Sequence, residues 1–509
     1  MKAKGTVYLV GAGPGDAGLL TLRGAELLAR ADVVLYDVLV NPELLRLAPA
    51  AAELICRGKQ SSPEALSHEQ MNALMVARAR EGKCVVRLKG GDPYIFGRGG
   101  EEAEELAAAH VAFEVVPGVS SIVAGPNYAG IPLTHRAHCS SFTVLTGHGD
   151  PDEGGTSLEL DQIARIPGTK VVLMGMKRMR ELAEALIARG VAGRTPVAVV
   201  QWGTTGQQQS LEGTLETIAD LVAQKQFAPP AITVIGDVVK LRKKLNWFEH
   251  RPLFGQRIVV TRARDQAGPL ARRLSDLGAD VLEIPTIKIG PPGDRKLLVE
   301  VLESLGEYDW LVFTSANGVT AFFNYFFKAF EDVRDIGGVR IAAVGPGTAA
   351  RLAELHLKVD VMPKEALGRK VADALTAYQS IENVKILLLR AEQANPDLPK
   401  ALEALGAIVD DVACYQTLPE TEDRNSAAAS LMERGADWIT FTSGSTVEHF
   451  HSRFDLPKLM AQFPKLRLAS IGPETSKAIA VLGLLPAVEA REHTVEGLVK
   501  ALLAGVKAK

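Results

Sequence analysis

Two glycine-rich turns, each directly after an apolar strand-like run, are the residues with the clearest chemical meaning. The first turn, Gly-Ala-Gly-Pro-Gly-Asp at 11–16, follows residues 7–10. The second, Gly-Gly-Asp-Pro-Tyr-Ile-Phe-Gly-Arg-Gly-Gly at 90–100, follows residues 85–89. Glycine lets backbone N–H groups come close to a ligand. Two such turns in one domain therefore predict a sizeable ligand that is held largely by main chain.

The first turn also matches a dinucleotide-binding fingerprint by its letters. A G-x-G-x-x-G match begins at Gly13, and Asp37 stands where the ribose-binding acid of that fingerprint is expected. Pro14 stiffens the turn and Asp16 brings a negative charge to the place of a pyrophosphate, so both residues disfavour a dinucleotide. A dinucleotide-binding oxidoreductase joined to a sensor of the periplasmic-binding-protein kind is the alternative from a different class.

The composition describes a globular protein without a dominant charge. Its 509 residues carry 57 Lys+Arg against 60 Asp+Glu, a net charge of −3, which leaves no basic field for nucleic acid. No apolar run reaches the roughly 18 residues of a membrane span, and the first ten residues resemble a β-strand more than a signal peptide. The four cysteines are far apart: Cys56, Cys84, Cys139 and Cys414. This spacing favours a reducing cytoplasm and argues against a zinc or disulfide framework.

A basic stretch near the middle divides the chain. Residues 240–256 contain a proline and a glycine, and a new strand-like run begins at Arg257. Because 509 residues exceed one ordinary hydrophobic core, we predict two domains, 1–249 and 250–509.

The second half repeats itself at a nearly constant spacing. Residues 257–263 recur as 385–391, 277–279 as 405–407 and 309–315 as 437–443, each at an offset of 128, and residues 343–348 recur as 470–475 at an offset of 127. Four agreements of this kind indicate two copies of one α/β unit. Two copies predict two lobes.

The order of elements predicts the fold class. In each copy, a short apolar run ends in a small-residue turn before a helix-like pattern, as in residues 311–323. The first half has a similar order, with a helix expected over 101–109 whose first turn is acidic, as the helix dipole favours. Strand, turn and helix in repeated order predict an α/β fold with parallel sheets and helices on both faces.

Several motifs of the first half together resemble one family. They are residues 10–16, 36–40, 58–59, 88–100, 116–118 and 130–136. The segment from about residue 5 to residue 249 resembles the uroporphyrinogen III C-methyltransferases, members of the tetrapyrrole methylase superfamily that make precorrin-2 for sirohaem and cobalamin. The resemblance implies a two-subdomain tetrapyrrole methylase fold and S-adenosylmethionine as the methyl donor.

The resemblance also implies which residues meet the methyl donor. These are Pro14, Gly90, Gly91, Asp92, Ile95, Ser120, Ser121, Met174 and Gly203. Many family members carry Thr-Ala where this chain has Ser120-Ser121, but serine keeps a hydroxyl group.

Two further residues stand at the family's acid and base positions. Asp37 matches the proposed proton acceptor and Lys59 the proposed proton donor, the general acid/base pairing that methylation of a macrocycle carbon requires. Asp37 as the cap of the following helix, and Lys59 as a solvated loop cation, are the structural alternatives.

Arg98, His135 and His138 also have alternatives. We expect Arg98 to bind a substrate carboxylate, whereas the alternative has it steady the glycine loop. His135 and His138 have the spacing of two metal ligands on a helix, but Pro132 favours a turn. The implied chemistry needs no metal, and we expect none.

From about residue 255 onward, the paired lobes resemble uroporphyrinogen III synthase. The residues that carry this resemblance are Thr261-Arg262, 313–319, 343–348, Tyr415, 441–446 and 471–475. The resemblance implies loss of water from hydroxymethylbilane, inversion of the last pyrrole ring and closure. Much of this reaction is control of conformation. Tyr415 is the candidate that assists departure of the hydroxyl group, and a buried tyrosine with a satisfied hydroxyl is the alternative.

Four hydroxyl side chains are the substrate-binding candidates of this half: Ser315, Thr348, Ser443 and Thr475. Each is expected at a strand end and helix start, where free N–H groups attract anions such as carboxylates. A role as N-caps is the alternative. Arg262 and Arg390 occupy equivalent positions of the repeat, which fits a shared structural role as well as substrate contact.

Together these features predict a bifunctional cytoplasmic enzyme. Its second half would make uroporphyrinogen III, and its first half would methylate that product at C2 and C7 to give precorrin-2. We expect small tetrapyrroles as partners, no nucleic acid or membrane, and a homodimer formed through the methyltransferase domain, as is typical of that family. A methyltransferase fused to a non-catalytic tetrapyrrole-binding module is the alternative.

Overall fold

The computed structural model describes residues 5–58, 65–147, 156–365, 368–423 and 426–507. The chain divides into two compact units: unit 1 is Met1–Ile258 with Ala271–Val281, and unit 2 is Val259–Leu270 with Leu282–Lys509. The domain boundary at 249/250 stays a prediction. Within the described ranges, no helix is both long and apolar enough to cross a membrane.

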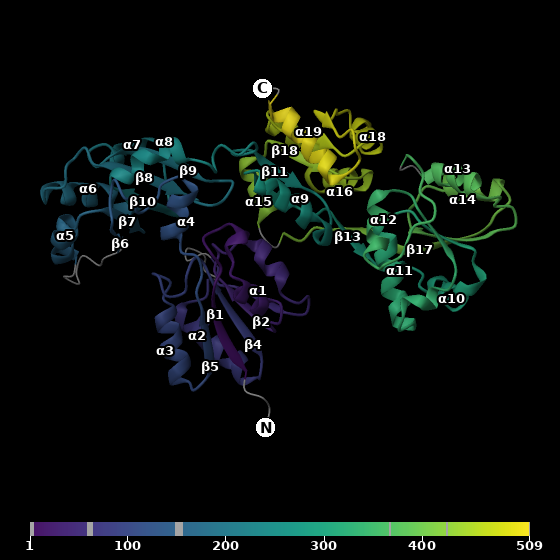
Figure 1. Cartoon of the computed structure of the whole chain (residues 1–509), viewed down its shortest axis with the longest axis horizontal. Helices are drawn as coiled ribbons and strands as arrows, with labels where there is room; N and C mark the ends of the chain where they lie inside the picture. Colours follow the sequence, from purple (N-terminus) through teal and green to yellow (C-terminus); the bar gives the residue numbers. More distant parts are fainter. Residues whose placement is uncertain (1–4, 59–64, 148–155, 366–367, 424–425, 508–509) are drawn as a thin grey trace. The chain divides into compact units, whose positions relative to one another are not determined.

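Unit 1 begins with a parallel sheet whose strand order is β3-β2-β4-β1-β5 (Figure 1). The strands are β1 (Thr6–Gly11), β2 (Val33–Tyr36), β3 (Glu53–Cys56), β4 (Cys84–Lys89) and β5 (Ala112–Val116), and the helices are α1 (Leu22–Leu28), α2 (His68–Arg80) and α3 (Gly99–Ala108). The strands expected before both glycine turns are therefore β1 and β4, and the helix expected over 101–109 is α3.

This sheet has an apolar core on each face because successive side chains of a strand point to opposite sides. Val34 and Val86 pack in the core that includes the α1 residues. Leu35 and Val85 pack in the other core, with α2 and α3. Helices on both faces of the sheet confirm the α/β prediction.

The second sheet of unit 1 is mixed, with the order β6-β7-β10-β8-β9. Its strands are β6 (Phe142–Thr146), β7 (Thr169–Leu173), β8 (Pro196–Gln201), β9 (Gln209–Thr214) and β10 (Ala231–Ile235), and the helices are α4 (Ser121–Tyr128), α5 (Thr156–Arg165), α6 (Met179–Ala188), α7 (Ile218–Gln224) and α8 (Arg242–Leu245). Only β6 and β7 pair in parallel, and the other pairs are antiparallel. The connection from β8 to β9 is too short for a parallel crossover. Two sheets confirm the two-subdomain prediction.

The rest of the chain forms two further sheets, with the orders β12-β11-β18-β19-β20 and β13-β17-β16-β14-β15. The strands are β11 (Arg257–Val260), β12 (Asp280–Glu283), β13 (Ile287–Gly290), β14 (Trp310–Phe313), β15 (Arg340–Ala343), β16 (Lys385–Ala391), β17 (Ile408–Pro419), β18 (Trp438–Phe441), β19 (Arg467–Ser470) and β20 (Val488–Glu489). The helices are α9 (Arg264–Asp276), α10 (Lys296–Glu303), α11 (Ala316–Ala329), α12 (Pro346–Ala353), α13 (Gly368–Tyr378), α14 (Asp397–Ala404), α15 (Ala427–Arg434), α16 (Gly444–Phe454), α17 (Leu456–Gln462), α18 (Pro473–Val481) and α19 (Val495–Lys507).

The two lobes are not the two copies of the sequence repeat. β11 and β16 are equivalent in the repeat, as are β14 and β18, yet β11 pairs with β18 and β14 pairs with β16. Each lobe thus combines the first strand of one copy with the middle strand of the other. The repeat shows which residues are equivalent, but not which copy supplies the neighbour of a given strand. Equivalent strands of the two copies can take each other's place in a sheet, and the pairs of strands then stay the same in kind.

The strand β13 departs from the parallel pairing of β14, β15, β16 and β17 in its sheet. It runs antiparallel to the end of β17, with Ile287 opposite Pro419 and Gly290 opposite Gln416. The chain enters this lobe at β13 and leaves it at the end of β17. The pairing of β13 with β17 therefore holds the two connections between the lobes together.

Two candidate active sites

The two glycine turns of unit 1 are joined directly by main-chain hydrogen bonds. The Gly91 N–H donates to the Gly13 carbonyl at 2.7 Å, and the Gly13 N–H donates to the Gly91 carbonyl at 3.2 Å. Both residues have positive φ values, 78° and 68°, which glycine adopts without steric cost. The turns form one main-chain platform.

The platform is closed on one side and open on the other. A Cβ on Gly118 would lie 2.2 Å from the Gly91 carbonyl oxygen, and one on Gly11 would lie 2.5 Å from the Gly118 Cα. A Cβ on Gly90 would meet only the Leu39 side chain, at 3.9 Å. Backbone therefore packs on backbone behind the turns, while Gly90 leaves room for a ligand.

Asp92 and Ser120 hold this platform with their side chains. The Asp92 carboxylate accepts hydrogen bonds from the N–H groups of Tyr94 (2.8 Å) and Gly118 (3.0 Å). Ser120 is the N-cap of α4 and accepts from Ile122 N–H at 3.4 Å. These side chains act on the shape of the turns, so a contact with the methyl donor would come from the main chain beside them.

The first turn is also tied to the second sheet's loops. The Asp16 carboxylate accepts a hydrogen bond from the Tyr128 hydroxyl at 2.7 Å, and the Asp16 N–H donates to the Thr204 hydroxyl at 3.0 Å. Burial and the Asp16 carboxylate raise the pKa of Tyr128, so the phenol remains a donor. Pro14 therefore lies two residues before a side chain and an N–H group that are both hydrogen-bonded to the other subdomain.

Left-handed backbone marks the other candidate residues. Met174 follows β7 with φ 55°, and Trp202 and Thr204 flank Gly203 with φ 50° and 74°. Arg98 has φ 57° at the N-cap of α3. Such conformations cost free energy outside glycine and gather at functional sites. Met174 and Gly203, two of the residues expected to meet the methyl donor, thus lie in or beside strained segments.

Charged side chains replace apolar ones at the carboxyl ends of two strands of the first sheet. Along β2 and β4, residues 33, 35 and 85 are apolar, whereas the next positions on the same face are Asp37, Arg87 and Lys89. Arg87 donates from Nη2 to Asp37 at 2.6 Å and from Nε to Glu102 at 3.1 Å, and Lys89 donates to the same Glu102 oxygen at 2.8 Å. We call these four residues the ion cluster.

The ion cluster is buried except at Asp37. The side chains of Arg87, Lys89 and Glu102 are at most 2% exposed, whereas that of Asp37 is 26% exposed. Burial lowers the pKa of Lys89. Burial also opposes the charge of Arg87, but the carboxylates of Asp37 and Glu102 outweigh it and raise the pKa of Arg87. The arrangement presents one carboxylate to solvent and supports it from inside.

Arg87, Lys89 and Glu102 are not among the site residues predicted from the sequence. The signal that would have found them is the run Val-Val-Arg-Leu-Lys, because a charged residue at alternate positions of a central parallel strand must find a buried partner.

The capping alternative for Asp37 is wrong. Asn41, not Asp37, caps the following 3₁₀ helix Pro42–Leu47, with its side chain accepting from Glu43 N–H at 2.9 Å. Lys59, the candidate proton donor, lies outside the described residues.

Arg98 and the two histidines have local partners. Arg98 pairs with Glu101 at 3.2 Å, and both side chains are more than half exposed, so this pair adds at most about 1 kcal/mol. His135 exchanges main-chain hydrogen bonds with Cys139, and His138 N–H donates to the His135 carbonyl, which confirms the expected turn. Among the described residues, no group of three His, Cys, Asp or Glu side chains is placed to hold a metal.

Exposed apolar side chains follow the same strand ends as the candidate residues. Val38 and Leu39 come after β2, Tyr94 to Phe96 after β4, Met174 after β7 and Trp202 after β8, with exposed fractions from 36% to 56%. A flat apolar ligand would cover side chains of this kind. Ile95 is among them, at 38% exposure.

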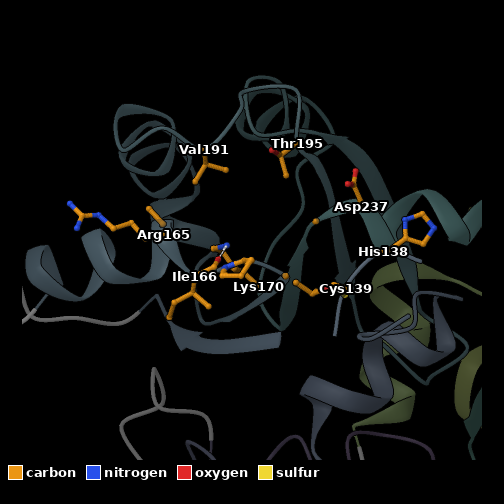
Figure 2. Close-up of a pocket in the computed structure, with 13 residues that line it drawn as sticks. His138, Cys139, Arg165, Ile166, Lys170, Val191, Thr195 and Asp237 are labelled. Carbon is orange, nitrogen blue, oxygen red and sulfur yellow. Dashed lines mark hydrogen bonds between the residues drawn. The ribbon is translucent and has the colours of Figure 1, made fainter. Parts of the chain in front are cut away.

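A separate pocket lies at the opposite end of the second sheet (Figure 2). Its volume is about 280 Å³, and its lining includes Thr169 and Lys170, the first residues of β7. Lys170 donates to the Ile166 carbonyl at 2.9 Å, and burial lowers its pKa. Met174 follows the other end of the same strand. None of the residues that line this pocket belongs to the glycine turns.

In unit 2, Tyr415 and Ser315 come together. The two hydroxyl oxygens are 2.9 Å apart, although Tyr415 lies on β17 and Ser315 precedes α11. Tyr415 is 7% exposed. Burial raises its pKa, and the hydrogen bonds with Ser315 and Asn317 act in the opposite direction. This pair is a neutral hydroxyl couple at the N-terminus of a helix.

The remaining hydroxyl candidates lie at equivalent helix starts. Ser315 accepts from Gly318 N–H at 3.0 Å and Ser443 from Thr446 N–H at 3.3 Å, so both serines are N-caps, as the alternative had it. Thr348 and Thr475 lie in the first turns of α12 and α18 and are 6% and 3% exposed.

Arg390 lies on β16, and its repeat-equivalent Arg262 follows β11. Arg390 forms an ion pair with Asp411, with Nε at 2.5 Å from the carboxylate, and donates to the Asn395 carbonyl at 2.6 Å. This supports a structural role for Arg390. Burial lowers the pKa of Arg262.

Comparison with known proteins identifies both halves. Residues 6–219 match the family model for tetrapyrrole (corrin/porphyrin) methylases, and residues 268–500 match that for uroporphyrinogen-III synthase HemD. A protein of Ruminiclostridium josui named porphyrin biosynthesis protein HemD is 39% identical over 501 residues, which cover 98% of either chain. The chain belongs to the family in which a tetrapyrrole methylase is fused to a uroporphyrinogen-III synthase. It is a bifunctional protein of tetrapyrrole biosynthesis.

Two other relatives match the methylase half alone. An S-adenosyl-L-methionine-dependent uroporphyrinogen III methyltransferase of Methanosarcina barkeri is 49% identical over 237 residues, 47% of this chain and 93% of that protein. The solved structure of a uroporphyrin-III C-methyl transferase of Thermus thermophilus with S-adenosyl homocysteine is 41% identical, with a TM-score of 0.40, and covers 46% of this chain and 99% of that one.

Proposed function

We propose that the chain is a bifunctional enzyme that converts hydroxymethylbilane to uroporphyrinogen III and then methylates this product at C2 and C7, giving precorrin-2. The observation that carries the methylation is the joined pair of glycine turns beside a supported, partly exposed carboxylate. Relatives that bear the corresponding names match each half of the chain.

The glycine turns suit S-adenosylmethionine because main chain on one side leaves space on the other, at Gly90. S-adenosylmethionine supplies the methyl group. The chain must then hold the macrocycle so that its nucleophilic carbon is in line with that group, and such positioning lowers a barrier by roughly 7–11 kcal/mol. The exposed apolar side chains after β2 and β4 support contact with a flat ring system.

Asp37 then accepts the proton that the macrocycle loses after methylation. Its carboxylate is 26% exposed, stands at the carboxyl end of β2 and is held from inside by Arg87. A general base placed in this way accelerates a step by about 10²–10⁴-fold.

In the synthase half, we propose that Tyr415 assists departure of the hydroxyl group of hydroxymethylbilane. Its raised pKa keeps the phenol protonated and able to donate. Helix N-termini beside Ser315, Ser443, Thr348 and Thr475 would attract the substrate carboxylates.

A coupled assay tests this proposal. Purified full-length chain receives hydroxymethylbilane and S-adenosylmethionine, and the absorbance of precorrin-2 is followed. If oxidation of the products yields uroporphyrin I alone, the isomer that forms spontaneously, the synthase proposal fails and the non-catalytic binding module takes its place. Tight binding of NAD in calorimetry, with none of S-adenosylmethionine, would instead restore the dinucleotide alternative.

Asp37→Ala tests the base. Its S-adenosylmethionine affinity should stay within about twofold of wild type, whereas methylation slows by about 10²-fold or more. Asp32→Ala is the matched control, since Asp32 precedes the same strand at its other end and binds Cys84 N–H at 2.8 Å. Wild-type turnover in Asp37→Ala would refute the role.

A further inference from the structure

The contacts of Arg87 within the ion cluster indicate a role beyond charge balance. We propose that Arg87 is a positioning residue for methylation: its buried guanidinium fixes the Asp37 carboxylate in place by bracing it against Glu102 of α3. This inference rests on the proposed role of Asp37. It adds how that group is held and what connects it to the glycine turns.

The geometry defines the position of Asp37 closely. Arg87 is 0% exposed and reaches two carboxylates, Asp37 at 2.6 Å and Glu102 at 3.1 Å. The guanidinium is planar and its donors have fixed directions. With one donor on Glu102, the other donor can meet Asp37 in only a narrow range of positions. The location of the Asp37 carboxylate is thus set relative to the start of α3.

The same cluster is attached to both glycine turns. Glu102 lies in the first turn of α3, directly after the second glycine turn. Lys89, which binds Glu102 at 2.8 Å, immediately precedes Gly90, and its carbonyl accepts from Ala12 N–H of the first turn at 2.7 Å. Asp37, the methyl-donor platform and α3 are therefore parts of one connected structure.

Stability alone gives a weak reason for such a cluster. A buried ion pair is often no more stabilising than well-packed apolar residues of similar size. Apolar residues do fill the same face one step earlier along each strand, at Leu35 and Val85. The change to charge occurs only where the strands end beside the platform, and there it leaves one carboxylate exposed. Positioning of that carboxylate accounts for the exception.

The test is a double-mutant cycle in the full-length chain. The variants are Arg87→Met, Arg87→Lys, Asp37→Asn and Asp37→Asn with Arg87→Met. For each we measure kcat and KM for methylation of uroporphyrinogen III, the Kd of S-adenosylmethionine by calorimetry, and hydrogen–deuterium exchange of β4 as a check on folding.

We expect Arg87→Met to lower kcat by about 10²-fold, since a displacement of about 1 Å can have that effect, with the Kd of S-adenosylmethionine within about twofold. The kcat of Arg87→Lys should lie between those of the wild type and Arg87→Met, because an ammonium lacks the planar fork that reaches both carboxylates. In the Asp37→Asn background, Arg87→Met should change kcat by no more than about twofold.

Three results would overturn the inference. They are a wild-type kcat in Arg87→Met, a wild-type kcat in Arg87→Lys, and the same loss from Arg87→Met with or without Asp37. If Arg87→Met does not fold, the cycle is run with Arg87→Lys, and the same criteria apply. A wild-type kcat in Asp37→Asn would refute the proposed function itself, so the two failures are distinguishable.

Arg78→Met is the matched control. Arg78 lies on α2 of the same subdomain and pairs with Glu53 at 2.7 Å, outside the ion cluster. We expect its kcat to stay within about twofold of wild type, in either Asp37 background. A loss of kcat in this variant equal to that in Arg87→Met would show a general effect of removing an ion pair and would overturn the positioning role.

Discussion

The two candidate sites are built from opposite kinds of polar group. In the methylase half, a carboxylate is held by a buried guanidinium, and four charges lie together. In the synthase half, a tyrosine hydroxyl lies 2.9 Å from a serine hydroxyl, and both groups are neutral. The methylase site holds a charged carboxylate in a fixed position, whereas the synthase site has uncharged hydroxyl donors at a helix N-terminus.

The difference follows from what each reaction asks of the protein. A carboxyl group can act as a base only when it is ionised, and an anion beside a protein interior needs counter-charge to remain there. A group that helps a hydroxyl to leave must carry a proton, and burial raises the pKa of Tyr415 so that it keeps one. Neutral donors also do not repel a substrate that bears several carboxylates.

The largest effect is expected from removing one carboxylate of the ion cluster. Glu102→Ala removes the carboxylate that Arg87 and Lys89 share and leaves two buried cations, which should destabilise the methylase half by about 3–5 kcal/mol. Hydrogen–deuterium exchange should show faster opening of β4 peptides and unchanged exchange of β14 peptides. Lys89→Met should cost less, because burial already lowers the pKa of Lys89 and disfavours its charge. Equal exchange in β4 before and after Glu102→Ala would contradict the view that the cluster depends on charge compensation.

The neutral site is tested by Tyr415→Phe. We expect about a 10²-fold slower synthase reaction with normal methylation of added uroporphyrinogen III. Tyr308→Phe is the control, since Tyr308 is another buried tyrosine of the same lobe, and its hydroxyl donates to Asp410 at 2.6 Å. The readout is the ratio of isomers III and I after oxidation. An unchanged rate in Tyr415→Phe would return this tyrosine to a structural role.

A smaller effect concerns the platform that only the methylase half has. Gly91→Ala imposes a Cβ at φ 68° without a steric contact closer than 3.8 Å. The strain of about 1–2 kcal/mol should weaken S-adenosylmethionine binding on the order of tenfold. Gly100→Ala, whose Cβ would meet nothing within 4 Å in α3, should leave binding unchanged. Calorimetry compares them, and equal affinities would show that the turn tolerates other conformations.

The smallest effect is a pH dependence near the ion cluster. Burial, with Arg57 and Arg98, lowers the pKa of His68 below its usual 6.5. The unfolded chain then binds a proton more readily than the folded one, so the stability of the methylase half should decrease as pH falls below about 6.5. Exchange of α2 peptides at pH 7.5 and 5.5 measures this, and His68→Asn should reduce the dependence. A dependence of equal size in the variant would assign it to other groups.

The sequence predicted the platform better than its support. The strands before both glycine turns, α3 and the Ser315 and Ser443 helix starts follow from local patterns of apolar residues, glycines and caps. The ion cluster joins residues from β2, β4 and α3, and its partners depend on which strands are neighbours. Asp92 shows the same limit: its letter lies in a binding motif, but its carboxylate closes the turn through Gly118, which is far along the chain.

The Tyr415 and Ser315 couple was beyond local reasoning for a related reason. The two residues are 100 positions apart and come from different copies of the repeat. The repeat-equivalent of Tyr415 is an isoleucine, Ile287, so the symmetry of the sequence gives no hint that this lobe holds a hydroxyl pair.

The exchange of strands between the lobes has a consequence for synthesis of the protein. β11 leaves the ribosome before the strands β13 to β17 of the other lobe, and its neighbour β18 follows only after them. Until β18 is made, β11 lacks this neighbour, and its apolar residues stay exposed while the other lobe is produced. Pairings of this sequence separation form slowly and leave aggregation-prone surface open meanwhile. A chain that ends before residue 438 therefore has one lobe without β18, β19 and β20, whereas every strand of the other lobe, β13 to β17, has already been made. The synthase half can become a stable body only once the segment from β18 onward has been made, and neither copy alone is sufficient.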